Sequence, residues 1–302
     1  MDSPYLALEE LKALAEPEEV HYLSGVALFK GGDLPKLAFS SFVKYAGKAI
    51  AVTNDVSEIA RELKGECFHV KIDSILSSGK GEIEVEAKKL SSYVKLGRDC
   101  PTLDLVFTDG LILVGLRKAQ RDTKSLERHS MKPYRQSGTL SADLARAAVN
   151  LSKARRAIYD PFAGLGGILI EAAWRGLECF GSDLDLKSLA KAKANLSALN
   201  YDCDVFAADA VKENVRGIEA IVTDPPYGRS TRAKASELIE LYKSFFYSAY
   251  DLLPPKGRLV FITDSKLWFY DDLESVGYKV VSVSKVYEHK SLTRAFYVAE
   301  RP

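Results

Sequence analysis

The segment Asp224–Tyr227, Asp-Pro-Pro-Tyr, combines groups that could carry out chemistry on an amine. It follows the apolar run 220–223, which predicts a buried strand that the prolines must end, because neither donates a ladder hydrogen bond. Asp224 and the Pro225 carbonyl could accept the hydrogens of a flat, conjugated amine while the Tyr227 ring stacks on it. A proline-rich turn with a packed tyrosine is the alternative at this point.

Three further aspartates follow short apolar runs upstream of this turn, as expected at the carboxyl ends of parallel strands, where ligands bind. Asp160 is placed to hold an ammonium group. Asp183 lies about 20 residues after Gly164, the separation typical of an acid that binds a ribose diol. Asp209 could accept a hydrogen bond from an adenine amine. Each aspartate alone could equally be a helix N-cap or a turn residue.

The segment Asp160–Gly167 is rich in small residues, which let the backbone approach a ligand ahead of a helix N-terminus. Gly164 and Gly166 match the first two glycines of a dinucleotide fingerprint, but Leu169 occupies the third place. A hydride-transfer cofactor is therefore disfavoured.

The elements that must position these residues alternate between strand and helix. Strands are predicted at 157–159, 178–182, 204–206, 220–222 and 258–263, and helices at 142–151, 167–175, 186–199 and 237–253. This alternation predicts an α/β fold with a Rossmann-like, mostly parallel, seven-stranded sheet. The last two runs, 278–287 and 294–300, are too close for a crossover helix, so an antiparallel terminal strand is expected.

The preceding part of the chain reads as α+β. We expect helices at 5–14 and 82–96, strands at 22–29 and 67–72, and a hairpin of 103–107 with 111–116. Residues 117–135 carry seven Lys and Arg against two acidic residues and little apolar periodicity. This segment is either a solvated linker or a linker that also contacts phosphate.

The bulk composition sets broad limits. The chain has 302 residues and a net charge of +1, which fits two domains and neither demands nor excludes nucleic acid. No apolar run is long enough for a membrane span, and no secretory signal is visible. The cysteines and histidines lack metal-site spacing, so we expect no metal and four reduced thiols in a cytoplasmic protein.

These motifs together resemble class I S-adenosylmethionine-dependent methyltransferases that modify amines. The longer stretches 137–150 and 223–231 resemble archaeal tRNA guanosine N2-methyltransferases that act on guanosine 10. Residues 66–117 resemble their THUMP domain, with 94–96 and 113–117 as its best matches. The resemblance covers roughly residues 60–302 and departs from the family at Ala163 and Leu165, where related enzymes often have Cys and Thr.

The resemblance implies a division into a short ferredoxin-like region (1–60), a THUMP-like RNA-binding domain (61–117), a linker (118–138) and a methyltransferase domain (139–302). It implies S-adenosylmethionine as cofactor, tRNA as partner, and catalysis by Asp224, Pro225 and Tyr227. The implied cofactor-binding residues are Thr139, Asp160, Phe162, Gly164, Gly166, Asp183, Leu184, Asp209, Ala210 and Asp224. Arg229 and Arg232 could bind flanking phosphates, or they could be solvated loop residues.

Other functions remain open on the sequence alone. The target could be guanosine at another tRNA position, such as 6, or N6 of adenine in nucleic acid. A small-molecule amine methyltransferase would leave the first 130 or so residues without a role. An RNA-binding protein with an inactive methyltransferase fold is disfavoured by the intact aspartates at 160, 183, 209 and 224.

Overall fold

The structure is a computed structural model that describes residues 4–75, 79–212, 215–228 and 235–302. The chain forms two compact units. The first contains the residues up to Leu14, Phe39–Phe42 and Asp122–Pro302, and the second contains Ala15–Ala38 and Val43–Arg121. The N-terminal helix thus groups with the larger unit, whereas the sequence suggests a separate region for residues 1–60.

The first unit is built on a seven-stranded sheet with the order β10-β9-β8-β11-β12-β14-β13. Neighbouring strands from β10 to β12 are parallel, and β14 runs antiparallel to both β12 and β13. The strands are β8 (Ala157–Asp160), β9 (Glu178–Asp183), β10 (Asp204–Ala207), β11 (Ala220–Thr223), β12 (Arg258–Asp264), β13 (Lys279–His289) and β14 (Leu292–Glu300). The predicted Rossmann-like fold with an antiparallel end is confirmed.

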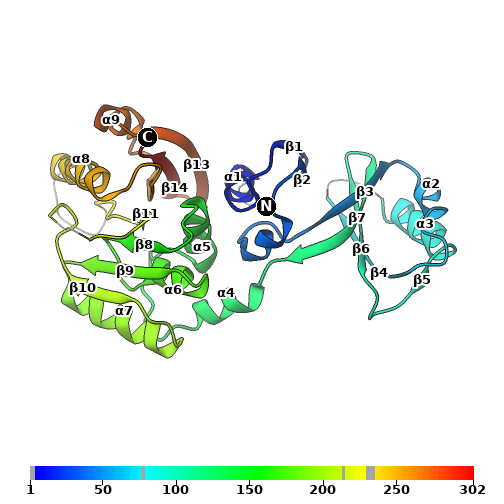
Figure 1. Ribbon diagram of the computed structural model, residues 1–302, viewed down its shortest axis with the longest axis horizontal. Helices are drawn as coiled ribbons and strands as arrows, with labels where there is room; N and C mark the ends of the chain where they lie inside the picture. The colour runs from blue at the N-terminus through cyan, green and yellow to red at the C-terminus, as the bar shows by residue number, and fades with distance from the viewer. Residues whose placement is uncertain (1–3, 76–78, 213–214, 229–234) are drawn as a thin grey trace. The chain divides into compact units, whose positions relative to one another are not determined.

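Helices cover both faces of this sheet (Figure 1). Because side chains alternate along a strand, Ile158 packs with one set of helices and Tyr159 with the other. One set is α5 (Ala142–Leu151), α6 (Gly167–Trp174) and α7 (Leu186–Ala198); the other is α8 (Ala235–Leu252) and α9 (Tyr270–Val276). Helix α9 is absent from the prediction, since its seven residues include three acids and one fully buried apolar side chain, Leu273.

The second unit contains a five-stranded sheet with the order β3-β7-β6-β4-β5 and a separate hairpin. The sheet strands are β3 (Tyr45–Thr53), β4 (Cys67–Ser74), β5 (Lys95–Leu96), β6 (Thr102–Thr108) and β7 (Leu111–Gln120). Helices α2 (Ser57–Ala60) and α3 (Lys80–Ser91) share a core with β4, β6 and β7, and η1 (Leu34–Phe39) is a 3-10 helix.

Two local predictions in this unit are wrong. The run 22–29 is not one strand, because Gly25, with φ +86°, turns the chain between β1 (Glu19–Leu23) and β2 (Val26–Lys30). The helix predicted for 82–96 ends at Ser91, because Lys95 and Leu96 pair with Cys67 and Phe68 of β4. Tertiary pairing therefore overrides the helical periodicity at this point.

The basic segment 117–135, for which a solvated linker is one expectation, contains helix α4 (Thr123–Ser130) with Asp122 as N-cap. His129 is buried against Glu171 of α6, and Arg146 of α5 donates to the same carboxylate at 2.6 Å. The pKa of His129 is lowered, mainly by burial. A buried carboxylate therefore fixes α4 to the rest of the first unit, and a helical pattern of only two turns was too short to identify.

Helix α1 (Pro4–Ala15) is joined to the same unit by the fully buried Glu10. Its carboxylate accepts hydrogen bonds from the Ser40 hydroxyl at 2.5 Å and from the backbone N–H groups of Ser41 and Phe42 at 2.7 and 3.0 Å. The Asn150 amide of α5 donates to it at 2.7 Å. Glu10 thus connects three parts of the chain that are distant in sequence.

Replacing Glu10 by alanine is expected to destabilise the first unit by about 3 kcal/mol, because several buried donors lose their acceptor. Calorimetric melting measures this loss. Glu9→Ala on the same helix is the control: Glu9 forms a partly exposed ion pair with Lys12, so its loss should cost less than about 1 kcal/mol. Equal losses of stability in the two variants would contradict the role of Glu10 as a buried acceptor that holds α1 in the first unit.

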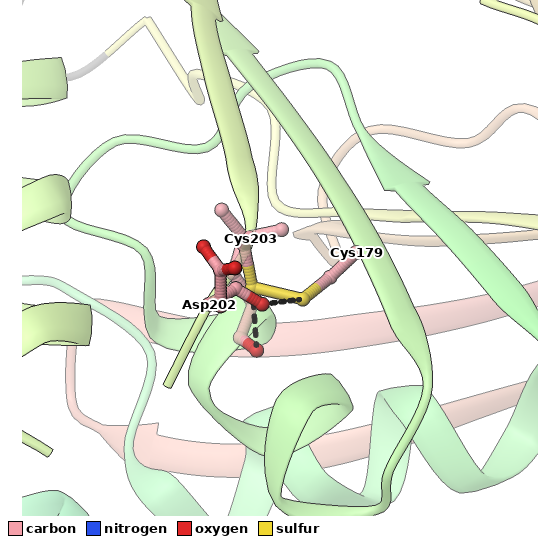
Figure 2. Close-up of a disulfide and its surroundings, with 4 residues drawn as sticks. Cys179, Asp202 and Cys203 are labelled. Atoms are coloured by element: carbon pink, nitrogen blue, oxygen red, sulfur yellow. Dashed lines mark hydrogen bonds between the residues drawn. A yellow bond between two sulfur atoms is a disulfide. The ribbon is translucent and has the colours of Figure 1, made fainter. Parts of the chain in front are cut away.

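The four cysteines are paired, so the expectation of reduced thiols is wrong. Cys67 and Cys100 form one disulfide in the second unit, and Cys179 and Cys203 form another in the first. Figure 2 shows the latter, which joins β9 to the residue before β10. Their separations of 33 and 24 residues gave no recognisable motif. Within the described ranges, no helix has the length and apolar character needed to cross a membrane.

Candidate active site

The aspartates singled out in the sequence lie at the carboxyl edge of the parallel strands. Asp160 ends β8 and Asp183 ends β9, while Asp224 directly follows β11. The parallel pairing places Asp160 beside Gly181 of β9 and Asp183 beside Ala207 of β10. The sheet therefore brings these carboxylates to the edge where ligands bind in this architecture.

The glycine-rich loop between β8 and α6 is held close to this edge. Gly166 is the N-cap of α6 with φ +79°, and a Cβ there would come within 3.3 Å of Ala192. The Gly164 N–H donates to the Asp183 carboxylate at 2.9 Å, and the Asp185 N–H donates to its other oxygen at 2.9 Å. The loop is thus fixed by Asp183, which is itself only partly buried and can still accept further donors.

Asp160 lies deep at the start of this loop and is 2% exposed. It accepts hydrogen bonds from the Thr223 hydroxyl at 2.6 Å and from the Phe162 N–H at 3.2 Å. Burial raises the pKa of its carboxyl to about 7, and the negative charge of Asp224 contributes in the same direction. A cation placed beside Asp160 would lower this pKa again, because it stabilises the ionised carboxylate.

Asp224 and Tyr227 of the Asp-Pro-Pro-Tyr turn contact each other directly. The Tyr227 hydroxyl donates to Asp224, while the Tyr242 hydroxyl of α8 donates to the Pro226 carbonyl at 3.2 Å. Burial raises the pKa of Asp224 to about 6, although Arg294 and the Tyr227 hydrogen bond act against it. The turn therefore presents a partly screened carboxylate and an aromatic ring held at its hydroxyl end.

The remaining predicted cofactor residues are spread around this edge. Thr139 is exposed and its hydroxyl donates to the Gln136 carbonyl at 2.8 Å, so in this structure it closes a turn. Phe162 packs edge-on against Phe245, with 5.3 Å between ring centroids. The positions that follow β9 and β10 differ in exposure: Leu184 is 73% exposed, Asp209 is partly exposed, and the Ala210 side chain is buried in the core.

Sequence reasoning missed two residues that hold the turn. Arg294 of β14 donates to the Asp224 carboxylate at 3.3 Å and to the Tyr227 hydroxyl at 2.6 Å. Tyr242 is a buried residue of α8, and its place in the apolar pattern of this helix predicts only core packing. The one available signal was the arginine itself, which directly precedes the apolar run 295–299. Arg229 and Arg232 lie outside the described residues.

The residues at this edge fit a cationic nucleoside better than a phosphate-bearing one. Asp160, Asp183, Asp209 and Asp224 supply carboxylates, which repel phosphate but suit an ammonium, a sulfonium, a ribose diol and an amine. In the described part of the chain, no group of three or more His, Cys, Asp or Glu residues could hold a metal ion. S-adenosylmethionine carries all four of the chemical groups that these carboxylates suit.

Comparison with protein families agrees with this chemistry. Residues 129–294 match the model of the UPF0020 family, described as an RMKL-like methyltransferase domain, and this match covers more than half of the chain. The chain belongs to this family. It is an S-adenosylmethionine-dependent methyltransferase.

Curated relatives extend the match beyond the UPF0020 domain. The chain is 37% identical over 299 residues to the tRNA (guanine(10)-N2)-dimethyltransferase of Methanothermobacter thermautotrophicus, covering 96% of this chain and 84% of the relative. It is 36% identical over 206 residues to the Pyrococcus abyssi protein of the same name, covering 66% of this chain and 62% of the relative. Human tRNA (guanine(10)-N(2))-methyltransferase TRMT11 is 33% identical over 141 residues, which is 37% of this chain and 30% of the relative.

Among solved structures, TrmN from Thermus thermophilus shares the fold. It superposes with a TM-score of 0.52 at 22% identity, covering 98% of this chain and 96% of that chain.

Proposed function

We propose that this UPF0020 methyltransferase transfers a methyl group from S-adenosylmethionine to N2 of guanosine 10 in tRNA. The observation that carries the proposal is the Asp224–Tyr227 turn, where a carboxylate and an aromatic ring meet at the carboxyl edge of the sheet. The Methanothermobacter relative, whose name gives this activity, supports it because the similarity spans nearly the whole chain.

The chemical problem is that the exocyclic N2 of guanine is a poor nucleophile, since its lone pair is delocalised into the ring. Bound S-adenosylmethionine supplies an electrophilic methyl group on a sulfonium. The Asp224 carboxylate and the Pro225 carbonyl accept the two amine hydrogens and stabilise the positive charge that develops on N2. Asp224 would then take the proton that N2 loses when the methyl group passes to it from the sulfonium, which would leave as a neutral thioether.

Tyr227 orients the base in this proposal. Its hydroxyl is bound by Asp224 and Arg294, so the ring has little freedom to turn. A guanine stacked on the ring would keep N2 in line with the methyl group. The base must first leave its helix, which costs a few kcal/mol.

The cofactor residues take the roles that their chemistry suggests. Asp160 pairs with the ammonium group, Asp183 binds the ribose diol and Asp209 accepts from the adenine amine. Gly164 and Gly166 let the loop approach the cofactor, while Thr139 meets the methionine carboxylate. The other contributing positions are Phe162, Leu184 and Ala210, of which Ala210 acts through its backbone because its side chain is in the core.

The affinity for S-adenosylmethionine is expected to fall as the pH falls below about 7. The pKa of Asp160 is raised to about 7, so protonation below that pH removes the charge that pairs with the ammonium group. Above that pH Asp160 itself stays ionised and adds no further change. Calorimetric titration between about pH 5.5 and about pH 8.5 measures the trend. Asp160→Asn should bind more weakly and lose most of this dependence; retention of the wild-type profile would contradict the role.

We further propose that residues 61–117 act as a THUMP-like RNA-binding domain, with 1–60, 118–138 and 139–302 as the other functional regions. Part of the charge of the basic segment 117–135 is used internally, because Arg117 pairs with Asp104 and Lys132 is buried. Its exposed cations, such as Lys118 and Lys124, remain suited to phosphate. Recognition should therefore depend on tRNA shape and backbone more than on base contacts.

We propose a cytoplasmic location, where tRNA is available. The two disulfides agree with a cytoplasm of the hyperthermophilic type, since intracellular proteins of hyperthermophilic archaea retain such bonds.

The test is to incubate the protein with unmodified tRNA and labelled S-adenosylmethionine, and then to map the methylated nucleoside by mass spectrometry. N2-methyl- or N2,N2-dimethylguanosine at position 10 supports the proposal. Methylation at guanosine 6, or N6-methyladenosine, would replace it by one of the alternatives, and absence of transfer with intact cofactor binding would oppose it.

A further inference from the structure

Arg294 is a buried cation beside the proposed catalytic turn. It is the third residue of β14 and is 1% exposed, and the strand continues with apolar residues from Ala295 to Ala299. Its register partner is Asp264, the last residue of β12, so it lies at the carboxyl edge of the sheet. A buried charge is costly unless it is paired, so its partners are informative.

The guanidinium of Arg294 binds three groups that belong to two parts of the site. One terminal nitrogen, Nη1, donates to the Tyr227 hydroxyl at 2.6 Å and to the Asp224 carboxylate at 3.3 Å. The other, Nη2, donates to the Gly138 carbonyl at 3.0 Å. Gly138 precedes Thr139 in the turn before α5. One side chain therefore links the amine-accepting turn with the segment proposed to face the methionine end of the cofactor.

The third guanidinium nitrogen is less well satisfied. Nε lies 3.5 Å from a carboxylate oxygen of Glu288 and has no hydrogen-bond acceptor among the described residues, although it is buried. An arginine selected only for stability would gain by satisfying this donor. The guanidinium is instead oriented so that Nη1 reaches the Asp224–Tyr227 turn and Nη2 reaches the Gly138 carbonyl.

The charge of Arg294 also acts on Asp224. Burial raises the pKa of this carboxyl to about 6, and Arg294 is the largest opposing influence. Charged and titratable groups from other elements also interact electrostatically with Asp224, namely Glu288 of β13, Asp160 of β8, Tyr242 of α8 and the neighbouring Tyr227. Glu288 and Asp160 are acidic, so Arg294 is the one cation among these groups.

We propose that Arg294 is a positioning residue for methyl transfer, which holds the Asp224 carboxylate, the Tyr227 ring and the Gly138 turn in one arrangement. The inference rests on the proposed function, because it needs Asp224 and Tyr227 to act on the amine. Arg294 itself contacts neither the base nor the methyl group in this scheme. Its loss should therefore lower kcat more than it weakens binding of S-adenosylmethionine.

The test compares Arg294→Met, Arg294→Lys and a matched control, Arg258→Met. Lysine keeps the charge but cannot bind three acceptors with a planar fork. Arg258 also spans strands of this sheet, since it lies on β12, pairs with Glu300 of β14 at 3.2 Å and donates to the Leu151 carbonyl at 3.1 Å. It is near the start of β12, away from the turn, so its loss reports the effect of removing a structural arginine.

For Arg294→Met, kcat should fall about 100-fold, the effect expected when reacting groups are misplaced by about 1 Å. The acidic limb of its pH–kcat profile should move to higher pH, because Asp224 loses the cation that pairs with it. Arg294→Lys should keep the limb near the wild-type position while kcat remains reduced. Arg258→Met should melt at lower temperature but leave kcat and the limb unchanged.

A second measurement does not depend on activity. The carboxyl 13C resonance of Asp224, assigned by its absence in Asp224→Asn, is titrated in the cofactor-free protein. Its pKa should be higher in Arg294→Met than in wild type and little changed in Arg294→Lys. Unchanged values of both the pKa and kcat in Arg294→Met would overturn the inference, as would an equal loss of kcat in Arg258→Met. Failure of the wild-type protein to methylate tRNA guanosine would instead oppose the proposed function.

Discussion

The variant Asp224→Asn is expected to transfer methyl groups at least about 1,000-fold more slowly than the wild type. The substitution keeps the size of the side chain but removes the negative charge that stabilises the methylated amine and accepts its proton. It also presents an amide donor towards Arg294 or the amine, where an acceptor is needed. Single-turnover rates with tRNA in excess of its dissociation constant measure the loss.

Affinity for S-adenosylmethionine separates this effect from misfolding. Calorimetry should give a dissociation constant for Asp224→Asn within about tenfold of wild type, since the ammonium, ribose and adenine partners are unchanged. Asp122→Asn, which alters the N-cap of α4 in the same unit, should retain full activity. A turnover of more than a few per cent in Asp224→Asn would remove Asp224 from the mechanism.

Removal of either disulfide is expected to destabilise its unit by about 3–4 kcal/mol. The bridges close loops of 33 and 24 residues, and loops of this length restrict the unfolded chain by about that free energy in the chain-entropy model. This is a large part of the 5–15 kcal/mol that holds a typical domain folded. Differential scanning calorimetry of Cys67→Ala/Cys100→Ala and of Cys179→Ala/Cys203→Ala measures each loss.

Each bridge lies within one unit, so each double variant should lower the melting of its own unit. A reducing agent should lower the melting temperature of the wild type, whereas a variant without cysteines should not respond to it. Alkylation before reduction, followed by mass spectrometry, checks that the bridges are present. Labelling of all four cysteines in unreduced, denatured protein would contradict both disulfides.

The sequence predicts the larger sheet well because each of its strands is marked by local composition. Buried runs such as Ala220–Thr223 are fully apolar apart from their last residue, and a proline follows β8 directly and β11 after one residue. The hairpin at Gly25 and the end of α3 were not predictable to the same degree, because pairing with distant residues decides them. The two disulfides were not predictable for the same reason, because each joins cysteines that are distant in the sequence.

The site was predictable where the chain itself carries the signal. Asp160, Asp183 and Asp224 stand at strand ends, so topology alone brings them together. Arg294 could not be placed in this way, because it reaches Asp224 across 70 residues and from an antiparallel strand. Tyr242 reaches Pro226 from a helix whose apolar pattern gives no sign of a polar contact. Side chains that hold a reactive group in place thus depend on the final packing.

The position of Glu10 has a consequence for biosynthesis. Asn150 of α5 donates to Glu10 and is synthesised 140 residues later. Helix α1 is therefore made long before the part of α5 against which it packs. Contacts with such sequence separation close late and slow folding. Until then the apolar face of α1, which includes Leu6 and Leu11, stays exposed to other partners. Helix α1 is therefore expected to reach its native place only after α5 has been synthesised.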